Sequence, residues 1–196
     1  MTWTIPNLLT VLRIAVIPVF MLAYYLPFSW GFTLAALLFA FAAVTDWLDG
    51  FLARMLNQTS SFGAFLDPVA DKLMVAAALV VLVDKNPLPL PDLVLVVPAI
   101  VIIGREIAIS ALREWMAVVG ESAAVAVSMV GKVKTTLQMI AIFLLIWRQP
   151  ILDLPTVWIG LTLLYVATAL TLWSMWRYLV AAWPTLRADV GGTNDA

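Results

Sequence analysis

Long apolar runs alternate with short polar breaks along the whole chain, and each run is close to the ~20 residues that a helix needs to cross a bilayer. The breaks include NQTSS and the proline-rich segment DKNPLPLPD. Lipid offers no hydrogen-bond partner to the backbone, so such runs are predicted to be helices. Six helices are expected, at about 5–26, 30–55, 61–83, 92–118, 123–147 and 155–183.

This pattern predicts an all-α, polytopic membrane protein, a bundle of six transmembrane helices with a short amphipathic N-terminal part. Residues 1–185 are expected to form one domain, and residues 186–196 a flexible polar tail on the cytoplasmic side. Cytoplasmic connections favour Lys and Arg. The predicted inner side is richer in these residues than the outer turns, which hold Lys85 and Arg148. Both termini are therefore expected to be cytoplasmic, together with Arg54, Arg113, Arg177 and Arg187.

Composition narrows the chemistry that this protein can perform. The chain is 64% hydrophobic and 12% charged, whereas about 25% is usual for a soluble domain. It contains no cysteine and no histidine, which excludes disulfides, thiol catalysis, histidine bases and zinc sites built from those ligands. The net charge of −1 and the lack of a basic tail give no reason to expect a nucleic acid partner.

Four aspartates interrupt the apolar pattern at the ends of the second and third predicted helices. At about 100° per residue, Asp46 and Asp49 share one helix face, and Asp67 and Asp71 share another. One alternative is that they are solvated charges at helix ends. However, acids within membrane helices are costly and usually functional, and four like charges need cations nearby. Oxygen ligands favour Mg²⁺ or Mn²⁺, and a pair of such ions is a common device for displacement at phosphorus.

The segment from Asp46 to Asp71 reads D-x2-D-G-x2-A-R-x8-G-x3-D-x3-D. It resembles the signature of the CDP-alcohol phosphotransferase family, with every fixed position present. These positions are Asp46, Asp49, Gly50, Ala53, Arg54, Gly63, Asp67 and Asp71. The resemblance implies a six-helix membrane enzyme that uses a CDP-linked substrate and two divalent cations.

The resemblance also implies roles for these residues. The four aspartates would hold the two metal ions, and Asp71 would also be the base that deprotonates the acceptor hydroxyl. The CDP group would contact the remaining motif residues, Gly50, Ala53, Arg54 and Gly63, together with Asp49. A direct displacement and a covalent phosphatidyl-enzyme intermediate both remain compatible with the sequence.

A second group of charges lies in the fourth and fifth predicted helices, in GREIAISALREWM and GKVKTT. Arg105, Arg113, Lys132 and Lys134 are candidates for binding a second anion, because arginine matches the geometry of phosphate. The alternative is that these cations pair with Glu106, with Glu114 or with the aspartates, or reach out to the membrane interface. An anionic acceptor such as glycerol 3-phosphate would use such a cluster.

On the first predicted helix, Asn7, Thr10 and Arg13 form a polar stripe about 120° wide. It is predicted to contact substrate, with Asn7 and Thr10 near the CDP group and Arg13 near the acceptor phosphate. The alternative is an interfacial helix whose polar side faces water or headgroups.

The segments IPNLLTVLR, VTDWLDGFLAR, FGAFLDPVADK, REIAISALREWM and GKVKTT together resemble family members that use glycerol 3-phosphate. The implied reaction converts CDP-diacylglycerol and glycerol 3-phosphate into phosphatidylglycerophosphate and CMP, at the cytoplasmic side of a bacterial inner membrane. The family likeness also implies a homodimer. Inositol phosphate or phosphatidylglycerol as acceptor remains an alternative. A cation or proton transporter and a purely structural membrane protein are alternatives from other classes.

Overall fold

The computed structural model describes residues 5–28, 30–55, 61–121 and 129–191. Within these ranges it describes the backbone alone at 5–6, 47, 49–54, 61–62, 64–65, 67, 129–130, 186 and 188–191. The described part of the chain contains six α-helices. They are α1 (Ile5–Tyr25), α2 (Gly31–Met55), α3 (Ser61–Asp84), α4 (Leu93–Val118), α5 (Met129–Trp147) and α6 (Thr156–Gly191).

The helix boundaries agree with the apolar pattern except at the end of the chain. The predicted start of the fifth helix, near 123, lies outside the described residues. The sixth helix was expected to end near 183, and this was wrong, because α6 continues through Pro184 to Gly191. One contact that supports the extra turns joins residues four apart, where the Arg187 guanidinium lies 5.2 Å from the centre of the Trp183 ring.

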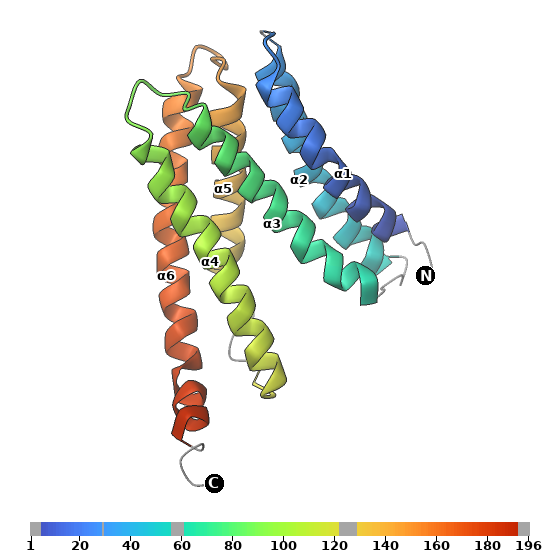
Figure 1. Ribbon diagram of the computed structural model, residues 1–196, viewed down its shortest axis with the longest axis vertical. Coiled ribbons are helices and arrows are strands. Elements are labelled where there is room, and N and C mark those ends of the chain that lie inside the picture. The colour runs from blue at the N-terminus through green and yellow to red at the C-terminus, as the bar shows by residue number, and fades with distance from the viewer. Residues whose placement is uncertain (1–4, 29, 56–60, 122–128, 192–196) are drawn as a thin grey trace.

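The helices form two closely packed pairs, α1 with α2 and α5 with α6 (Figure 1). Helix α3 lies between the pairs, and α4 packs against α3 and α6. Gly160 allows α5 and α6 to approach, because a Cβ atom there would lie 3.1 Å from the carbonyl oxygen of Ala141. The loops after α1, α3 and α5 gather at one end of the molecule. The helices spread toward the other end, where α1 begins and α6 ends (Figure 1).

Arg148, directly after α5, contacts several segments at the looped end of the bundle. Its guanidinium donates to the Tyr24 hydroxyl at 2.6 Å and to the Lys85 carbonyl oxygen. It also lies 3.8 Å from the centre of the Phe32 ring. Arg148 has a positive φ of 61°, which a non-glycine residue rarely adopts. One side chain thus connects four segments at this end of the bundle.

The interior changes character along the length of the bundle. Toward the looped end it is apolar and is built around large side chains such as Phe20, Phe39 and Leu145. Toward the spread end, nearer the chain termini, the buried side chains include Arg13, Arg105 and several other polar groups. Buried polar groups must be paired or serve a ligand, so this half of the interior is where a functional site is expected.

Three of the six described helices are long and apolar enough to cross a membrane, and they comprise Asn7–Tyr25, Leu93–Val118 and Thr156–Thr185. Among the residues whose side chains are described, α2 contributes a shorter apolar stretch, Gly31–Asp46. The prediction of an all-α fold is confirmed, and membrane crossing by all six helices remains a prediction.

Candidate active site

The four aspartates of the motif lie where α2 ends and α3 begins. Asp46 and Asp49 belong to the last turns of α2, and Asp67 and Asp71 to the first turns of α3. The two helices run in opposite directions and pack against each other. The structure describes the side chains of Asp46 and Asp71. The predicted roles of Asp49, Asp67, Gly50, Ala53 and Arg54 rest on side chains that lie outside its described part.

Asp46 forms an ion pair with Arg13 of α1. The Nη1 atom of Arg13 lies 2.6 Å from Oδ1 of Asp46. Only 1% of the arginine side chain is exposed, whereas 44% of the aspartate side chain is. The carboxylate is therefore held on one side by a buried cation and remains open to solvent or a ligand on the other.

The polar stripe of α1 faces the protein interior. Asn7, Thr10 and Arg13 are all buried, with Thr10 completely inaccessible. The alternative in which this stripe faces water is therefore wrong. All three residues interact with other groups, and contact of Asn7 and Thr10 with CDP remains a prediction. In this structure Arg13 contacts Asp46 of the motif. Contact of Arg13 with the acceptor phosphate also remains a prediction.

Asp71 connects the aspartate end of α2 to the charges of α4. It lies two helical turns after Gly63, which is buried on the same face of α3. Its carboxylate lies within electrostatic range of two other acids, Asp46 and Glu106, and of the base Arg13. The two groups of charges recognised in the sequence are thus neighbours in the fold.

The oxygen donors at this site fit a hard divalent cation. Among the residues whose side chains are described, no three Asp or Glu side chains come together to hold a metal, since Asp49 and Asp67 fall outside that set. The described donors are the carboxylates of Asp46 and Asp71. The sequence offers no nitrogen or sulfur ligand from His or Cys. Carboxylates near one another are suited to Mg²⁺ or Mn²⁺ rather than to softer metals.

Glu106 forms the centre of the second cluster. One oxygen of its carboxylate accepts hydrogen bonds from Arg105 Nη1 at 2.8 Å and from Lys134 Nζ at 2.9 Å. Both cations are almost fully buried, with exposed fractions of 6% for Arg105 and 2% for Lys134. The alternative in which these cations pair with Glu106 is therefore what the structure shows.

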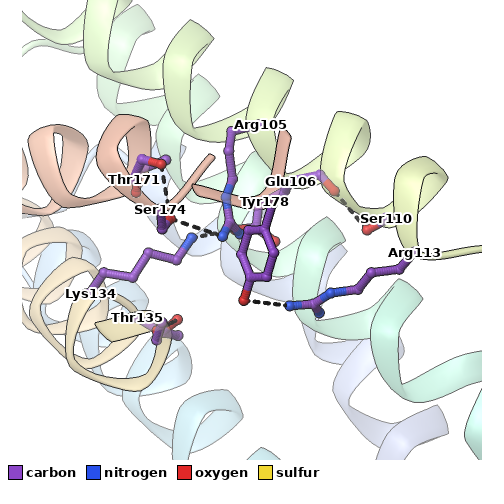
Figure 2. Close-up of polar contacts among 10 residues, drawn as sticks. Arg105, Glu106, Ser110, Arg113, Lys134, Thr135, Thr171, Ser174 and Tyr178 are labelled. Carbon is purple, nitrogen blue, oxygen red and sulfur yellow. Dashed lines mark hydrogen bonds and ion pairs between the residues drawn. The ribbon is translucent and has the colours of Figure 1, made fainter. Parts of the chain in front are cut away.

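Two residues of α6 complete this cluster, and the sequence analysis missed both. Arg105 Nη2 donates to the Ser174 hydroxyl at 3.1 Å, and Arg113 Nη2 donates to the Tyr178 hydroxyl at 3.1 Å (Figure 2). Thr171, Ser174 and Tyr178 are spaced by three and four residues, so they share one face of α6. This polar stripe in an otherwise apolar helix was the feature of the sequence that could have indicated a functional face on α6.

The remaining predicted cations are placed differently. Arg113 is half-buried and reaches Tyr178, whereas Lys132 is exposed. Lys132 and Lys134 are two residues apart on α5, which turns their side chains about 200° away from each other. The structure brings Lys134, Arg105 and Arg113 into one cluster and leaves Lys132 outside it. A role for Lys132 in acceptor binding remains a prediction.

The cluster on α4, α5 and α6 carries more positive than negative charge. Arg105, Arg113, Lys134 and Glu106 together carry a formal charge of +2, and the Asp71 carboxylate lies within electrostatic range of Glu106. The Nε atoms of Arg105 and Arg113 are buried and have no hydrogen-bond partner within the described part of the chain. A buried donor without a partner is unfavourable, so the cluster is suited to receive an anion with several oxygen atoms.

Comparison with known proteins shows the family of this chain. A family model described as CDP-alcohol phosphatidyltransferase matches residues 3–176. The chain is 56% identical over 183 residues to a CDP-diacylglycerol–glycerol-3-phosphate 3-phosphatidyltransferase of Pectobacterium atrosepticum, covering 93% of this chain and 96% of that protein. It is 51% identical over 193 residues to a protein with the same name from Escherichia coli, covering 97% and 98% of the two chains. The resemblance inferred from the motif is confirmed, and the chain belongs to the CDP-alcohol phosphatidyltransferase family.

Proposed function

We propose that the protein transfers the phosphatidyl group of CDP-diacylglycerol to a hydroxyl of sn-glycerol 3-phosphate. The products are phosphatidylglycerophosphate and CMP. The observation that carries this choice of acceptor is the cluster of two buried cations, Arg105 and Lys134, with the half-buried Arg113. With Glu106, these residues carry a formal charge of +2. A phosphate monoester is close to a dianion near neutral pH, so it matches this charge, whereas an uncharged alcohol does not. The names of the relatives from Pectobacterium atrosepticum and Escherichia coli support the same acceptor.

The aspartates of α2 and α3 are proposed to hold two divalent cations, Mg²⁺ or Mn²⁺. Asp46, Asp49, Asp67 and Asp71 would supply the carboxylate oxygens. When bound, the ions would stabilise negative charge on the phosphorus oxygens and on the departing CMP. Gly50, Ala53, Arg54, Gly63, Asn7 and Thr10 are proposed to surround the CDP group, together with Asp49.

Proton transfer is assigned to Asp71. Its carboxylate is within electrostatic range of both Asp46 and Glu106, which supports a position between the proposed CDP site and the proposed acceptor site. The acceptor hydroxyl would give its proton to the Asp71 carboxylate while its oxygen bonds to phosphorus. The bond from that phosphorus to the CMP oxygen breaks, and CMP leaves with the electron pair. No histidine is available for this step, and a carboxylate is the remaining general base of suitable basicity.

The proposed orientation places the site at the cytoplasmic side of a bacterial inner membrane, with six crossing helices. The start of α1 and the end of α6 lie at the same end of the molecule as the end of α2 and the start of α3, to which the aspartates belong (Figure 1). The helix segments at that end of the molecule contain Arg54, Arg113, Arg177 and Arg187. This supports the orientation, because cytoplasmic segments carry an excess of positive charge. The diacylglycerol tails would remain in the bilayer. A homodimer is proposed from the family alone.

The test is a panel of acceptors supplied to the purified protein in detergent, with CDP-diacylglycerol and Mg²⁺. Glycerol 3-phosphate, inositol phosphate, inositol, serine and phosphatidylglycerol are compared by CMP release. We expect turnover with glycerol 3-phosphate alone. Asp71→Asn should lower that turnover by at least about 100-fold, because a general base contributes on the order of 10²–10⁴.

The matched control is Asp84→Asn, which makes the same change at the other end of α3. Asp84 accepts a hydrogen bond from Tyr25 at 2.7 Å, far from the proposed site along the helix. This variant should keep its turnover. CMP release with another acceptor alone would reject the proposed acceptor. The absence of CMP release from folded protein with every acceptor would favour the transporter alternative.

A further inference from the structure

Tyr178 of α6 lies between the two arginines of α4 that the proposed function assigns to the acceptor phosphate. The centre of its ring lies 5.7 Å from the guanidinium carbon of Arg105 and 5.2 Å from that of Arg113. Its hydroxyl also accepts the hydrogen bond from Arg113. Figure 2 shows the ring with one arginine on each side. Tyr178 is buried, with 6% of its surface exposed.

The two arginines have no reason within α4 to direct their side chains to one point. They are eight residues apart, which corresponds to about 12 Å along a helix axis. Their like charges also repel each other. The electron-rich face of an aromatic ring attracts a guanidinium within about 6 Å, and more strongly where water is excluded. Tyr178 offers this attraction to both groups from a neighbouring helix.

Ser174, one turn earlier on α6, also helps to hold an arginine of α4 in place. Each arginine thus has one hydroxyl partner on that helix, Ser174 for Arg105 and Tyr178 for Arg113. The Ser174 hydroxyl in turn donates to the backbone oxygen of Thr171 at 2.9 Å, which leaves its lone pairs directed to accept from arginine. The α6 face therefore fixes the guanidinium groups before any anion binds.

We propose that Tyr178 is a positioning residue for the acceptor phosphate, which holds Arg105 and Arg113 so that both guanidinium groups act on one phosphate group. The proposal rests on the proposed function, because the phosphate in question is that of glycerol 3-phosphate. Groups that are held in the bound arrangement lose less freedom when the ligand arrives. Removing Tyr178 therefore weakens acceptor binding without touching the reacting atoms.

The experiment compares Tyr178→Phe and Tyr178→Leu by steady-state kinetics, with each substrate varied in turn. Tyr178→Phe keeps the ring and removes the hydroxyl, and the KM for glycerol 3-phosphate should rise about five- to tenfold, since a hydrogen bond to a charged group is lost. Tyr178→Leu also removes the ring, and the rise should reach about 30-fold or more. Both variants should keep kcat and the KM for CDP-diacylglycerol within about twofold, because the lost interaction is the same in the ground state and the transition state.

The matched control is Tyr165→Phe, which removes a tyrosine hydroxyl from the same helix. That hydroxyl donates to the Val94 carbonyl oxygen at 3.1 Å and takes no part in the cluster. The kcat of Tyr165→Phe and its KM for each substrate should not change. Thermal unfolding of each variant separates a binding effect from a loss of folded protein, and if Tyr178→Leu does not fold, Tyr178→Phe alone decides.

Two results would overturn the proposal. An unchanged KM for glycerol 3-phosphate in Tyr178→Phe would show that the arginines do not need the tyrosine. A parallel loss of kcat and of affinity for both substrates would show a general structural role. Failure of the proposed function is seen separately and earlier, because the unaltered protein would then show no turnover with glycerol 3-phosphate, and both proposals would be rejected.

Discussion

The Lys134 ammonium group and the Glu106 carboxylate lie 2.9 Å apart and form an ion pair that joins α5 to α4. The same carboxylate oxygen is 2.8 Å from Arg105, so one anion serves two buried cations. This arrangement stabilises the folded protein without an acceptor. It also leaves positive charge that a phosphate can neutralise, which connects the stability of the cluster to its proposed ligand.

Glu106→Gln should therefore destabilise the protein and make it more responsive to glycerol 3-phosphate. Loss of the shared anion leaves two buried cations without charge compensation, at a cost of about 1–3 kcal/mol for a partly exposed carboxylate. Glycerol 3-phosphate supplies the missing negative charge, so it should raise the Tm of the variant more than that of the unaltered protein. Thermal unfolding with and without the ligand measures this. The control is Glu114→Gln, which alters an exposed acid of the same helix. The prediction is refuted if glycerol 3-phosphate raises the Tm of Glu106→Gln and of the unaltered protein by the same amount.

The two lysines of α5 allow a direct comparison between a buried and an exposed cation. Lys134→Met should raise the KM for glycerol 3-phosphate at least tenfold, because a charged hydrogen bond to phosphate is worth about 1.5–3 kcal/mol. Lys132→Met removes the same charge two residues away, from an exposed side chain. It should have the smaller effect, about threefold or less, since exposed charges are screened by solvent. Equal effects would mean that burial in the cluster does not select the functional lysine.

The Arg13–Asp46 pair predicts an asymmetry between its two partners. Asp46→Ala takes an anion away from a guanidinium that is 1% exposed, whereas Arg13→Met leaves a carboxylate that is 44% exposed and can be hydrated. Asp46→Ala should cost about 1–3 kcal/mol in the free energy of unfolding. Arg13→Met should lower the free energy of unfolding by less through the loss of this pair, because water can hydrate the remaining carboxylate. Denaturant unfolding in detergent measures both, with Glu121→Ala as an exposed control, and the reverse order would contradict the assigned burial.

Arg148→Ala is expected to affect stability rather than chemistry. The side chain connects Tyr24, Phe32 and Lys85 at the looped end, away from the aspartates. Its loss removes two hydrogen bonds from a charged donor, to the Tyr24 hydroxyl and to the Lys85 carbonyl oxygen, which still accepts from the Tyr24 hydroxyl at 3.2 Å. The expected cost is about 2–4 kcal/mol in all. The Tm should fall, while kcat at a temperature where the variant is folded stays within about twofold. A large loss of kcat in folded protein would show that the looped end acts on the site.

The course of the helices could be predicted from the sequence because length and hydropathy determine which segments can span a bilayer. The spacing of the four aspartates predicts that they lie on two helix faces, and the structure has them in the last turns of α2 and the first turns of α3. Their convergence on metal ions remains a prediction. The rotation of each helix about its axis could not be predicted. Lipid and protein core are both apolar, so an apolar stripe does not mark the interior of a membrane bundle.

That limitation explains what was missed. The contacts of Ser174 and Tyr178 were missed, and the sequence left the stripe at Asn7, Thr10 and Arg13 open between an inward and an interfacial face. Both depend on which faces of α1 and α6 turn inward. The extension of α6 was missed for a different reason. The predicted end near 183 lies directly before Pro184, and a helix can continue past the one hydrogen bond that proline cannot donate.

The central claim is that the cation cluster of α4, α5 and α6 selects an acceptor by its phosphate, and the most direct test compares two acceptors in two proteins. The values of kcat/KM for glycerol 3-phosphate and for glycerol are measured for the unaltered protein and for Arg105→Gln. We predict that the preference for glycerol 3-phosphate falls at least tenfold in the variant, which corresponds to about 1.4 kcal/mol or more. The value for glycerol should hardly change. If the preference is the same in both proteins, Arg105 does not read the phosphate, and the assignment of this cluster is wrong.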